Sequence, residues 1–327
     1  MARAVWLGWF EHTPQPFPRC LGQISQGMLA DVSAVLCGWR ARILESVGGF
    51  DGVIDALLCH LGVLLTGGAA ATEHPRGIAI HGPPGSGKSY LADVLATVTA
   101  PSGFSPEALD IAAAVAGTPE AMAAFRLALS RATKHARHAP AGTAVVLLVL
   151  ERAESLLPAF EDEDEQALQK QLDPHRAVSE QILAELRLWR EEGLPAMVLV
   201  PWAATAPIPP ELSGSGALEL SFTLPAPLAF TQRRAVLEVC TRNLRLGDAA
   251  ATLLDFEAGA TAGFLPCDIA ALCRAAALAA VHRATSSGAN VAAVGVLADD
   301  FACAHEKTQP TLMRGVATAM RSRSHAV

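Results

Sequence analysis

Aromatic residues and charge are both scarce in this chain of 327 residues. Aromatic residues make up 5% of the sequence, with a single tyrosine, and charged residues make up 17%. The formal net charge is -7, which is mildly acidic. Because a nucleic-acid or anionic-membrane surface needs clustered Lys and Arg to displace counterions, we expect neither kind of partner.

Cysteine pairs and long apolar runs are missing as well. The seven cysteines form no Cys-x-x-Cys pair with zinc-ligand spacing, which indicates buried thiols of a reducing compartment. They are Cys20, Cys37, Cys59, Cys240, Cys267, Cys273 and Cys303. The first ten residues are too short and broken for a signal peptide, and no eighteen-residue apolar run occurs. We expect a protein of the cytosol or of the cytosolic face of an organelle, without an integral membrane segment.

Apolar residues are nevertheless plentiful, at 51%, so the chain is expected to fold around a buried core. Short apolar runs alternate with helical stretches, which predicts an α/β fold: a mostly parallel sheet with helices on both faces. The predicted strands are Gly77–His81, Thr143–Leu150, Ala196–Trp202 and Ala217–Phe222. Beyond Pro225 the pattern predicts helices only, which indicates a separate small all-helical domain.

A nucleoside triphosphate site is predicted between the first strand and the helix that follows it. The motif is G-x-x-x-x-G-K-[ST], formed by Gly82, Pro83, Pro84, Gly85, Ser86, Gly87, Lys88 and Ser89. In such a loop backbone N–H groups and the positive helix end face the phosphates. Lys88 would reach the β and γ phosphates of ATP, and Ser89 would hold Mg²⁺, with Tyr90 beside them. A glycine-rich turn with an exposed lysine is the alternative.

Several further motifs, in the same order, make the chain resemble the AAA family of ring-forming ATPases. Residues 47–51 (Val-Gly-Gly-Phe-Asp) resemble a segment that lies against adenine, and 75–77 (Pro-Arg-Gly) resemble the lead into the first strand. Residues 116–120 and 124–125 resemble the stretch after the pore loop. Residues 261–273 resemble the start of a lid helix, and Asp300-Phe301 resembles a pair in the last helix.

The resemblance implies a P-loop NTPase fold with a small C-terminal lid, and a hexameric ring of one or several kinds of subunit that binds ATP and ADP. It adds Val47, Gly48 and Asp268 to the predicted nucleotide site. The domains are then an N-terminal segment (1–45), which contains one predicted helix, a nucleotide-binding domain (46–225), and the lid with a C-terminal tail (226–327).

The residues that the family uses for hydrolysis are altered. Its second strand ends in Asp-Glu, of which Asp orients the magnesium shell and Glu polarises water. Here Glu151 stands at the magnesium position and Arg152 at the position of the base, and a guanidinium cannot take a proton from water. If the match to the family's Asp-Glu pair is shifted by one residue, Glu151 becomes the base but Leu150 stands at the magnesium position. A longer shift would make Glu154 the base and put its carboxylate beyond the end of the strand.

Other family positions differ in the same direction. Thr205 replaces the Asn that senses the γ phosphate. The segment 210–221, where the family carries arginine fingers, contains no Arg. The predicted pore-loop segment 110–115 is aliphatic and has Val115 where an aromatic residue would grip substrate. These changes predict weak or absent hydrolysis and poor threading of a protein substrate, whose identity the sequence does not indicate.

Three functions follow as hypotheses. The first is an ATP-binding ring subunit that hydrolyses little ATP. Within the family it looks most like the first ATPase domain of the peroxisome-biogenesis AAA proteins, which would place it at the cytosolic face of the peroxisome. The valosin-containing-protein type is a competing relative. The second hypothesis is an active ATPase that remodels proteins with a base from an unexpected position, and the third is a scaffold that binds no nucleotide.

Some features admit both a functional and a structural interpretation. The tryptophans of the N-terminal stretch mark either a partner contact or packing on the core; they are Trp6, Trp9 and Trp39. Three arginines on one predicted helix could contact a nucleotide or a neighbouring subunit; the alternative is a polar helix face with ordinary i,i+4 ion pairs. They are Arg233, Arg234 and Arg242. The histidines lack acidic or cysteine partners at ligand spacing, and we predict no metal site from them.

Overall fold

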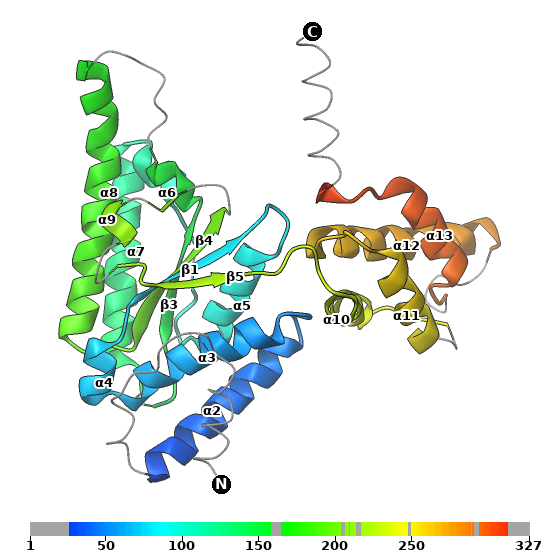
Figure 1. Ribbon diagram of the computed structural model, residues 1–327, viewed down its shortest axis with the longest axis horizontal. Coiled ribbons are helices and arrows are strands. Elements are labelled where there is room, and N and C mark those ends of the chain that lie inside the picture. The colour runs from blue at the N-terminus through cyan, green and yellow to red at the C-terminus, as the bar shows by residue number, and fades with distance from the viewer. Residues whose placement is uncertain are drawn as a thin grey trace. The chain divides into compact units, whose positions relative to one another are not determined.

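The structure is a computed structural model (Figure 1). It describes residues 26–106, 108–140, 142–157, 165–203, 207–208, 210–213, 217–247, 250–288, 290 and 294–312. Residue contacts divide the chain into two compact units. The first consists of the chain up to Ile43 with Gly52–Gly82 and Lys88–Leu224; the second consists of Leu44–Asp51, Pro83–Gly87 and the chain from Pro225.

The first unit is built on a five-stranded sheet with the order β2-β3-β4-β1-β5, in which every neighbouring pair is parallel. The strands are β1 (Gly77–Gly82), β2 (Ala108–Asp110), β3 (Val146–Glu151), β4 (Ala196–Ala203) and β5 (Leu220–Thr223). The helices are α2 (Gln26–Leu44), α3 (Asp51–Thr66), α4 (Gly68–Glu73), α5 (Lys88–Thr99), α6 (Ile111–Val115), α7 (Pro119–His138), α8 (Glu165–Glu191) and α9 (Pro210–Ser213), with the 3-10 turn η2 (Ala153–Leu156).

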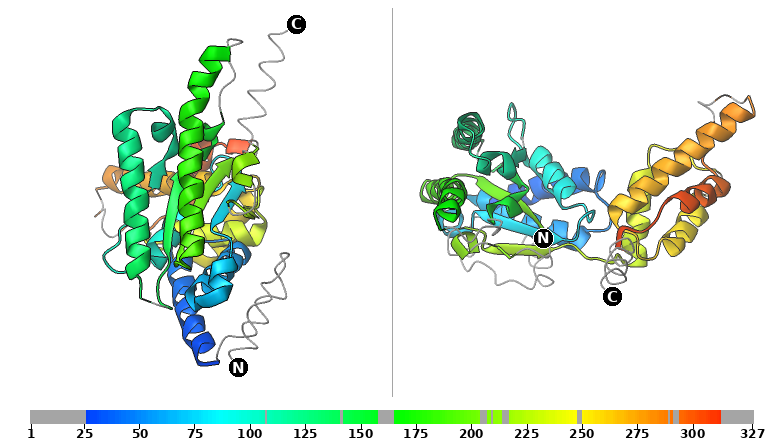
Figure 2. Two further views of the ribbon diagram at one scale, coloured as in Figure 1. Left: turned by 90° about the vertical axis from the view of Figure 1, so that its left-hand side faces the viewer. Right: turned by 90° about the horizontal axis from the view of Figure 1, so that it is seen from above.

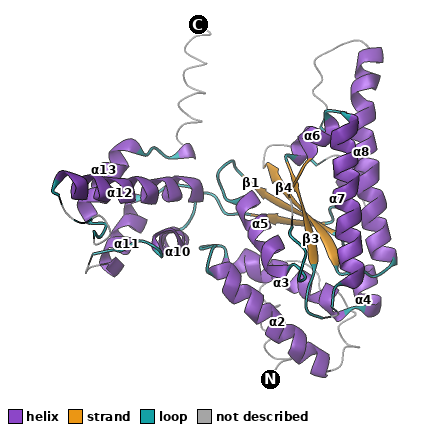
Figure 3. Cartoon of the chain, turned by 180° about the vertical axis from the view of Figure 1, so that it is seen from behind, coloured by secondary structure: helices purple, strands orange, loops and turns teal. Residues whose placement is uncertain are grey.

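Helices cover both faces of this sheet. Leu148 of β3 and Val200 of β4 belong to a core that also contains residues of α7 and α8. The alternate residues of these two strands, Leu147, Val149 and Leu199, are also buried, and α5 contacts β3 and β4. Figure 3 shows the sheet between α5 and the α7–α8 pair. Strands buried on both faces need continuous apolar runs, which β3 and β4 have, so the predicted α/β P-loop NTPase fold is confirmed.

Helices α7 and α8 lie side by side (Figure 2) and are joined by polar contacts. The indole Nε1 of Trp189 donates to the Thr133 hydroxyl at 2.7 Å, and Trp189 is fully buried. Nearer the helix ends, Arg137 forms two hydrogen bonds with the Glu192 carboxylate, at 2.6 and 2.7 Å. The buried indole contributes packing area, and its N–H is satisfied as a buried donor must be.

Two local predictions are wrong. The acidic run 161–165 and the Gln/Lys/Asp/Pro-containing stretch after it predict a solvated loop, but α8 begins at Glu165 and contains Pro174 in its interior. A proline disfavours a helix because it lacks an N–H, but this position is accepted within a long helix. Strand β2 was not predicted because it has three residues and none is buried, so no apolar run announces it.

The second unit is helical, with α10 (Phe230–Thr241), α11 (Ala250–Ala260), α12 (Pro266–Ser286) and α13 (Ala298–Lys307), and one parallel bridge between Leu246 and Val296. Helix α12 packs against α10 and α13. The carboxylate oxygen Oε2 of the buried Glu257 on α11 lies 2.7 Å from Nε2 of His305 on α13, within hydrogen-bond distance.

The three arginines of the second unit have structural partners. The buried Arg233 donates to the carbonyls of Leu228 (2.6 Å) and Ala258 (2.9 Å). Arg234 pairs with Glu238 one turn away and with Asp255, and Arg242 donates to the carbonyl of Glu45. These contacts favour the structural interpretation.

Other sequence features have simple outcomes. Trp39 is buried, whereas Trp6, Trp9 and the acidic residues 161–164 lie outside the described residues. In the described part of the chain six cysteines are free thiols, no group of three or more His, Cys, Asp or Glu side chains is arranged to hold a metal ion, and no helix has the length and apolarity to cross a membrane.

Two histidines are buried against each other beside the sheet. The rings of His60 and His74 lie 5.2 Å apart, and His60 also meets Phe222 edge to face at 5.7 Å. Burial lowers the pKa of His60 to about 4, and burial with the neighbouring His60, Arg76 and Arg190 lowers the pKa of His74 to about 3. Both rings are therefore neutral in the folded protein at neutral pH.

We predict that this pair makes the protein acid-sensitive. The unfolded chain protonates each histidine near pH 6.5, but the folded chain does so only near pH 3 to 4, so the free energy of unfolding falls as the pH drops below about 6.5. The slope approaches ~1.4 kcal/mol per pH unit per histidine. Urea titrations between pH 7.5 and 5 measure it. A His60→Gln/His74→Gln variant should have a flatter slope, whereas the exposed His138→Gln should keep the wild-type slope; equal slopes in all three proteins would contradict the prediction.

Candidate functional site

The predicted phosphate loop is a tight turn between β1 and α5. The N–H of Ser86 donates to the carbonyl of Pro83 at 3.2 Å, and α5 begins at Lys88. Gly85 and Gly87 have φ angles of 82° and 90°, in the region that side chains disfavour. The loop therefore needs glycine at both places, and it leads directly into the N-terminus of a twelve-residue helix, whose first N–H groups have no intrahelical partner.

Lys88 lies at the carboxyl edge of the sheet in the first unit. Its Nζ donates to the carbonyl of Gly82 at 2.8 Å, at the end of β1. Burial lowers the pKa of Lys88, and the nearby carboxylates of Glu154 and Glu151 oppose that shift. The ammonium is thus held beside the loop by a backbone oxygen and by two negative charges.

The side chain of Ser89, the residue after Lys88, contacts the carboxylate of Glu151, the last residue of β3. The Ser89 hydroxyl donates to Glu151 Oε2 at 3.0 Å, and Glu151 Oε1 is buried without a hydrogen-bond partner among the described residues. Such an unsatisfied buried carboxylate oxygen is costly unless something else binds it. Mg²⁺ takes oxygen ligands, so a serine hydroxyl next to a carboxylate with an unused oxygen fits this ion.

The side chain of Arg152, the residue after β3, extends toward the neighbouring strand β2. It is the non-glycine residue with a positive φ in the described part of the chain (φ 54°, ψ 36°). Its guanidinium forms an ion pair with Asp110, the last residue of β2, and its side chain is 63% exposed. Asp110 also caps α6 by accepting from the N–H of Ala113 at 3.3 Å. The cation at the expected position of the base therefore has its own acidic partner.

Glu154 returns to the sheet edge after this left-handed turn. The buried residues Ala153 and Leu156 hold the η2 turn against the core. Glu154 Oε1 accepts from the N–H of Ala203, the last residue of β4. The sequence placed this carboxylate beyond the strand end and assigned it no role. Only the three-dimensional turn reveals its position, because no local motif encodes it.

The glycines at 48 and 49 allow close packing within the second unit. A Cβ on Gly48 would lie 2.3 Å from the carbonyl oxygen of Ala235, and one on Gly49 would lie 2.6 Å from that of Gln232, both on α10. Val47 and Phe50 on either side are buried. The adjacent backbone thus fixes this segment against α10, and a role of Val47 and Gly48 toward adenine stays a prediction.

Asp268 is fully engaged with protein groups. Its Oδ2 accepts from the N–H groups of Leu265 (3.0 Å) and Thr311 (2.9 Å), at the beginning of α12. The next residue back, Cys267, donates its N–H to the carbonyl of Gly85 at 3.2 Å. Asp268 therefore orders the part of α12 that contacts the phosphate loop, and direct contact with nucleotide stays a prediction.

The remaining predicted residues are less informative. Tyr90 is 56% exposed on α5. Thr205 lies outside the described residues. In the first unit the structure brings together Lys88, Ser89 and Glu151 and adds Glu154, whereas the loop residues 83–87 and Asp268 belong to the second unit.

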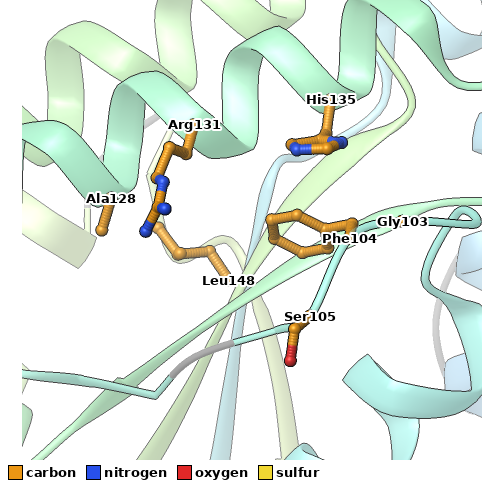
Figure 4. A pocket seen from close by; sticks show the side chains of 7 residues that line it. All are labelled: Gly103, Phe104, Ser105, Ala128, Arg131, His135 and Leu148. Atoms are coloured by element: carbon orange, nitrogen blue, oxygen red, sulfur yellow. The ribbon is translucent and has the colours of Figure 1, made fainter.

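A pocket elsewhere in the first unit shares no residue with this site (Figure 4). His135 extends from α7 toward Phe104, and their ring centres lie 5.0 Å apart, whereas Arg131 of the same helix extends toward Leu148. The pocket is floored by Leu148 of β3. None of its residues was predicted to bind a ligand.

The backbone at Arg152 gives a test of this geometry. A left-handed conformation costs an ordinary residue about 1 kcal/mol or more, and an exposed ion pair contributes no more than about 1 kcal/mol. We expect Arg152→Gly to be as stable as wild type within about 1 kcal/mol, and Arg152→Val, which is β-branched, to be at least ~1 kcal/mol less stable than Arg152→Gly. Denaturant unfolding measures both. Equal stability of the two variants would show that residue 152 does not adopt this conformation in solution.

Comparison with known proteins gives a similarity to an ATPase. No family model matches the chain. Over 247 residues it is 28% identical to ATPase family gene 2 protein homolog B of Bos taurus, which covers 75% of this chain and 29% of that protein. The chain thus matches less than a third of the relative's length. The similarity supports the AAA-type ATPase resemblance at the level of the family, and it does not support the narrower peroxisome-biogenesis branch.

Proposed function

We propose that this chain is an ATP-binding module of an AAA-type ATPase, in which Mg²⁺ and ATP bind at residues 82–89. The observation that carries the proposal is the pair of contacts below the loop: Lys88 on the carbonyl of Gly82, and Ser89 on the carboxylate of Glu151. Both side chains follow the loop at the start of α5, where a triphosphate would meet N–H groups and a positive helix end.

Each residue has a distinct task in this proposal. When ATP binds, Lys88 donates to phosphate oxygens instead of the carbonyl of Gly82. The negative phosphates stabilise the protonated ammonium, which burial disfavours. Ser89 and Glu151 hold the ion, which neutralises phosphate charge when bound. Arg152 remains with Asp110 and keeps its proton, so it cannot activate water. Turnover by the family's usual arrangement is therefore lost, and we expect weak hydrolysis.

The wider biological setting remains part of the proposal. A ring of six subunits follows from the AAA resemblance, as does exchange of ATP for ADP, and the name of the Bos taurus relative is consistent with an ATPase. Location in the cytosol or at the cytosolic face of the peroxisome, and a part in receptor recycling there, rest only on the sequence pattern. Nucleotide binding does not depend on them.

Equilibrium binding of a fluorescent ATP analogue tests the proposal. We expect saturable binding that requires Mg²⁺, and at least about tenfold weaker binding in Lys88→Ala, because hydrogen bonds to charged groups contribute about 1.5–3 kcal/mol. Lys134→Ala, which removes an exposed lysine of α7, is the matched control and should bind as wild type. If the folded wild-type protein binds no analogue, the scaffold hypothesis replaces this one.

A further inference from the structure

The carboxyl edge of the sheet has several acidic side chains, and their partners differ. Glu151 accepts from Ser89, and Asp110 is paired with Arg152 and accepts from Ala113. Asp110 is thus committed to other groups, and the unpartnered oxygen of Glu151 is the one assigned above to Mg²⁺. Glu154 is bound through one oxygen, Oε1, to the N–H of Ala203, so its other oxygen can meet a water molecule or ligand that approaches this edge.

The strand register places Glu154 close to the phosphate-binding lysine. Ala203, which donates to Glu154, is the partner of Gly82 in the parallel pairing of β1 with β4. Gly82 in turn accepts from Lys88 Nζ at 2.8 Å. Glu154 therefore lies on the side of β3 that faces Lys88, whereas Arg152 extends to the β2 side.

We propose that Glu154 is the general base for ATP hydrolysis by this chain, in place of Arg152, which stands at the position where the base is expected. The inference rests on the proposed nucleotide site. Glu154 accepts one proton from a water molecule as the water oxygen bonds to the γ phosphorus. The bond from that phosphorus to the β–γ bridging oxygen breaks, and its electron pair stays with ADP. Inorganic phosphate leaves, and Glu154 returns its proton to solvent.

Position and protonation chemistry both favour Glu154 over its neighbours. Arg152 is protonated under ordinary conditions, and Glu151 is engaged with Ser89, on the proposed magnesium side. The N–H of Ala203 orients the Glu154 carboxylate without consuming both oxygens. The buried Ala153 and Leu156 fix the turn that carries it. A base held in this way has the limited freedom that proton transfer requires.

The decisive variant is Glu154→Gln. The glutamine carbonyl can still accept from Ala203, so the turn is preserved, but an amide does not accept a proton from water. Phosphate release should fall at least about tenfold, since a positioned base contributes about 10²–10⁴-fold. The affinity for a fluorescent ATP analogue should stay equal or become tighter, because one negative charge near the phosphates is removed. Glu154→Asp keeps a carboxylate and should retain part of the activity.

Controls separate this inference from the proposed function. Lys88→Ala should abolish phosphate release, which identifies the activity as that of the chain, and Arg152→Ala should leave release within about threefold of wild type. Wild-type rates in both Glu154→Gln and Glu154→Asp would overturn the inference, as would a wild-type protein that binds the analogue but releases no phosphate. Absence of binding by folded wild-type protein would overturn the proposed function and this inference with it.

Discussion

The parallel pairing of β1 with β4 is the constraint on which the candidate site depends. It places Gly82, where the phosphate loop begins, beside Ala203, where β4 ends. Because parallel strands present their carboxyl ends at one edge, the groups at the ends of β1, β3 and β4 gather there although they come from distant parts of the sequence. Lys88, Glu151 and Glu154 reach the same edge by this route.

The left-handed residue at 152 decides which side chains face that edge. A regular continuation of β3 would alternate its side chains between the two faces of the sheet. The turn at Arg152 ends this alternation, sends the guanidinium to Asp110 and lets η2 carry Glu154 toward β4. The pairing of Arg152 with Asp110 and the position of Glu154 beside β4 are thus two consequences of one backbone conformation.

The sequence predicts well those parts of the fold that local chemistry determines. The turn between β1 and α5 and the buried strands β3 and β4 each have a motif or an apolar run within a few positions. Strand β2 was missed because three residues without a buried side chain give no apolar signal, and the start of α8 was missed because Pro174 is a contrary local signal. The position of Glu154 was missed for a similar reason: it depends on Ala203, 49 residues away.

Charge balance explains how a strand that is followed by Arg152 remains compatible with the proposed binding of a polyanion. Arg152 is a cation near the candidate site, and an unpaired guanidinium there would compete with Lys88 for acidic partners. Asp110 removes that competition, because it pairs with Arg152 on the β2 side and leaves Glu151 and Glu154 to Lys88 and Ser89. The site therefore keeps one half-buried cation near two carboxylates, the arrangement in which a magnesium-bound triphosphate could displace contacts without leaving a charge unpaired.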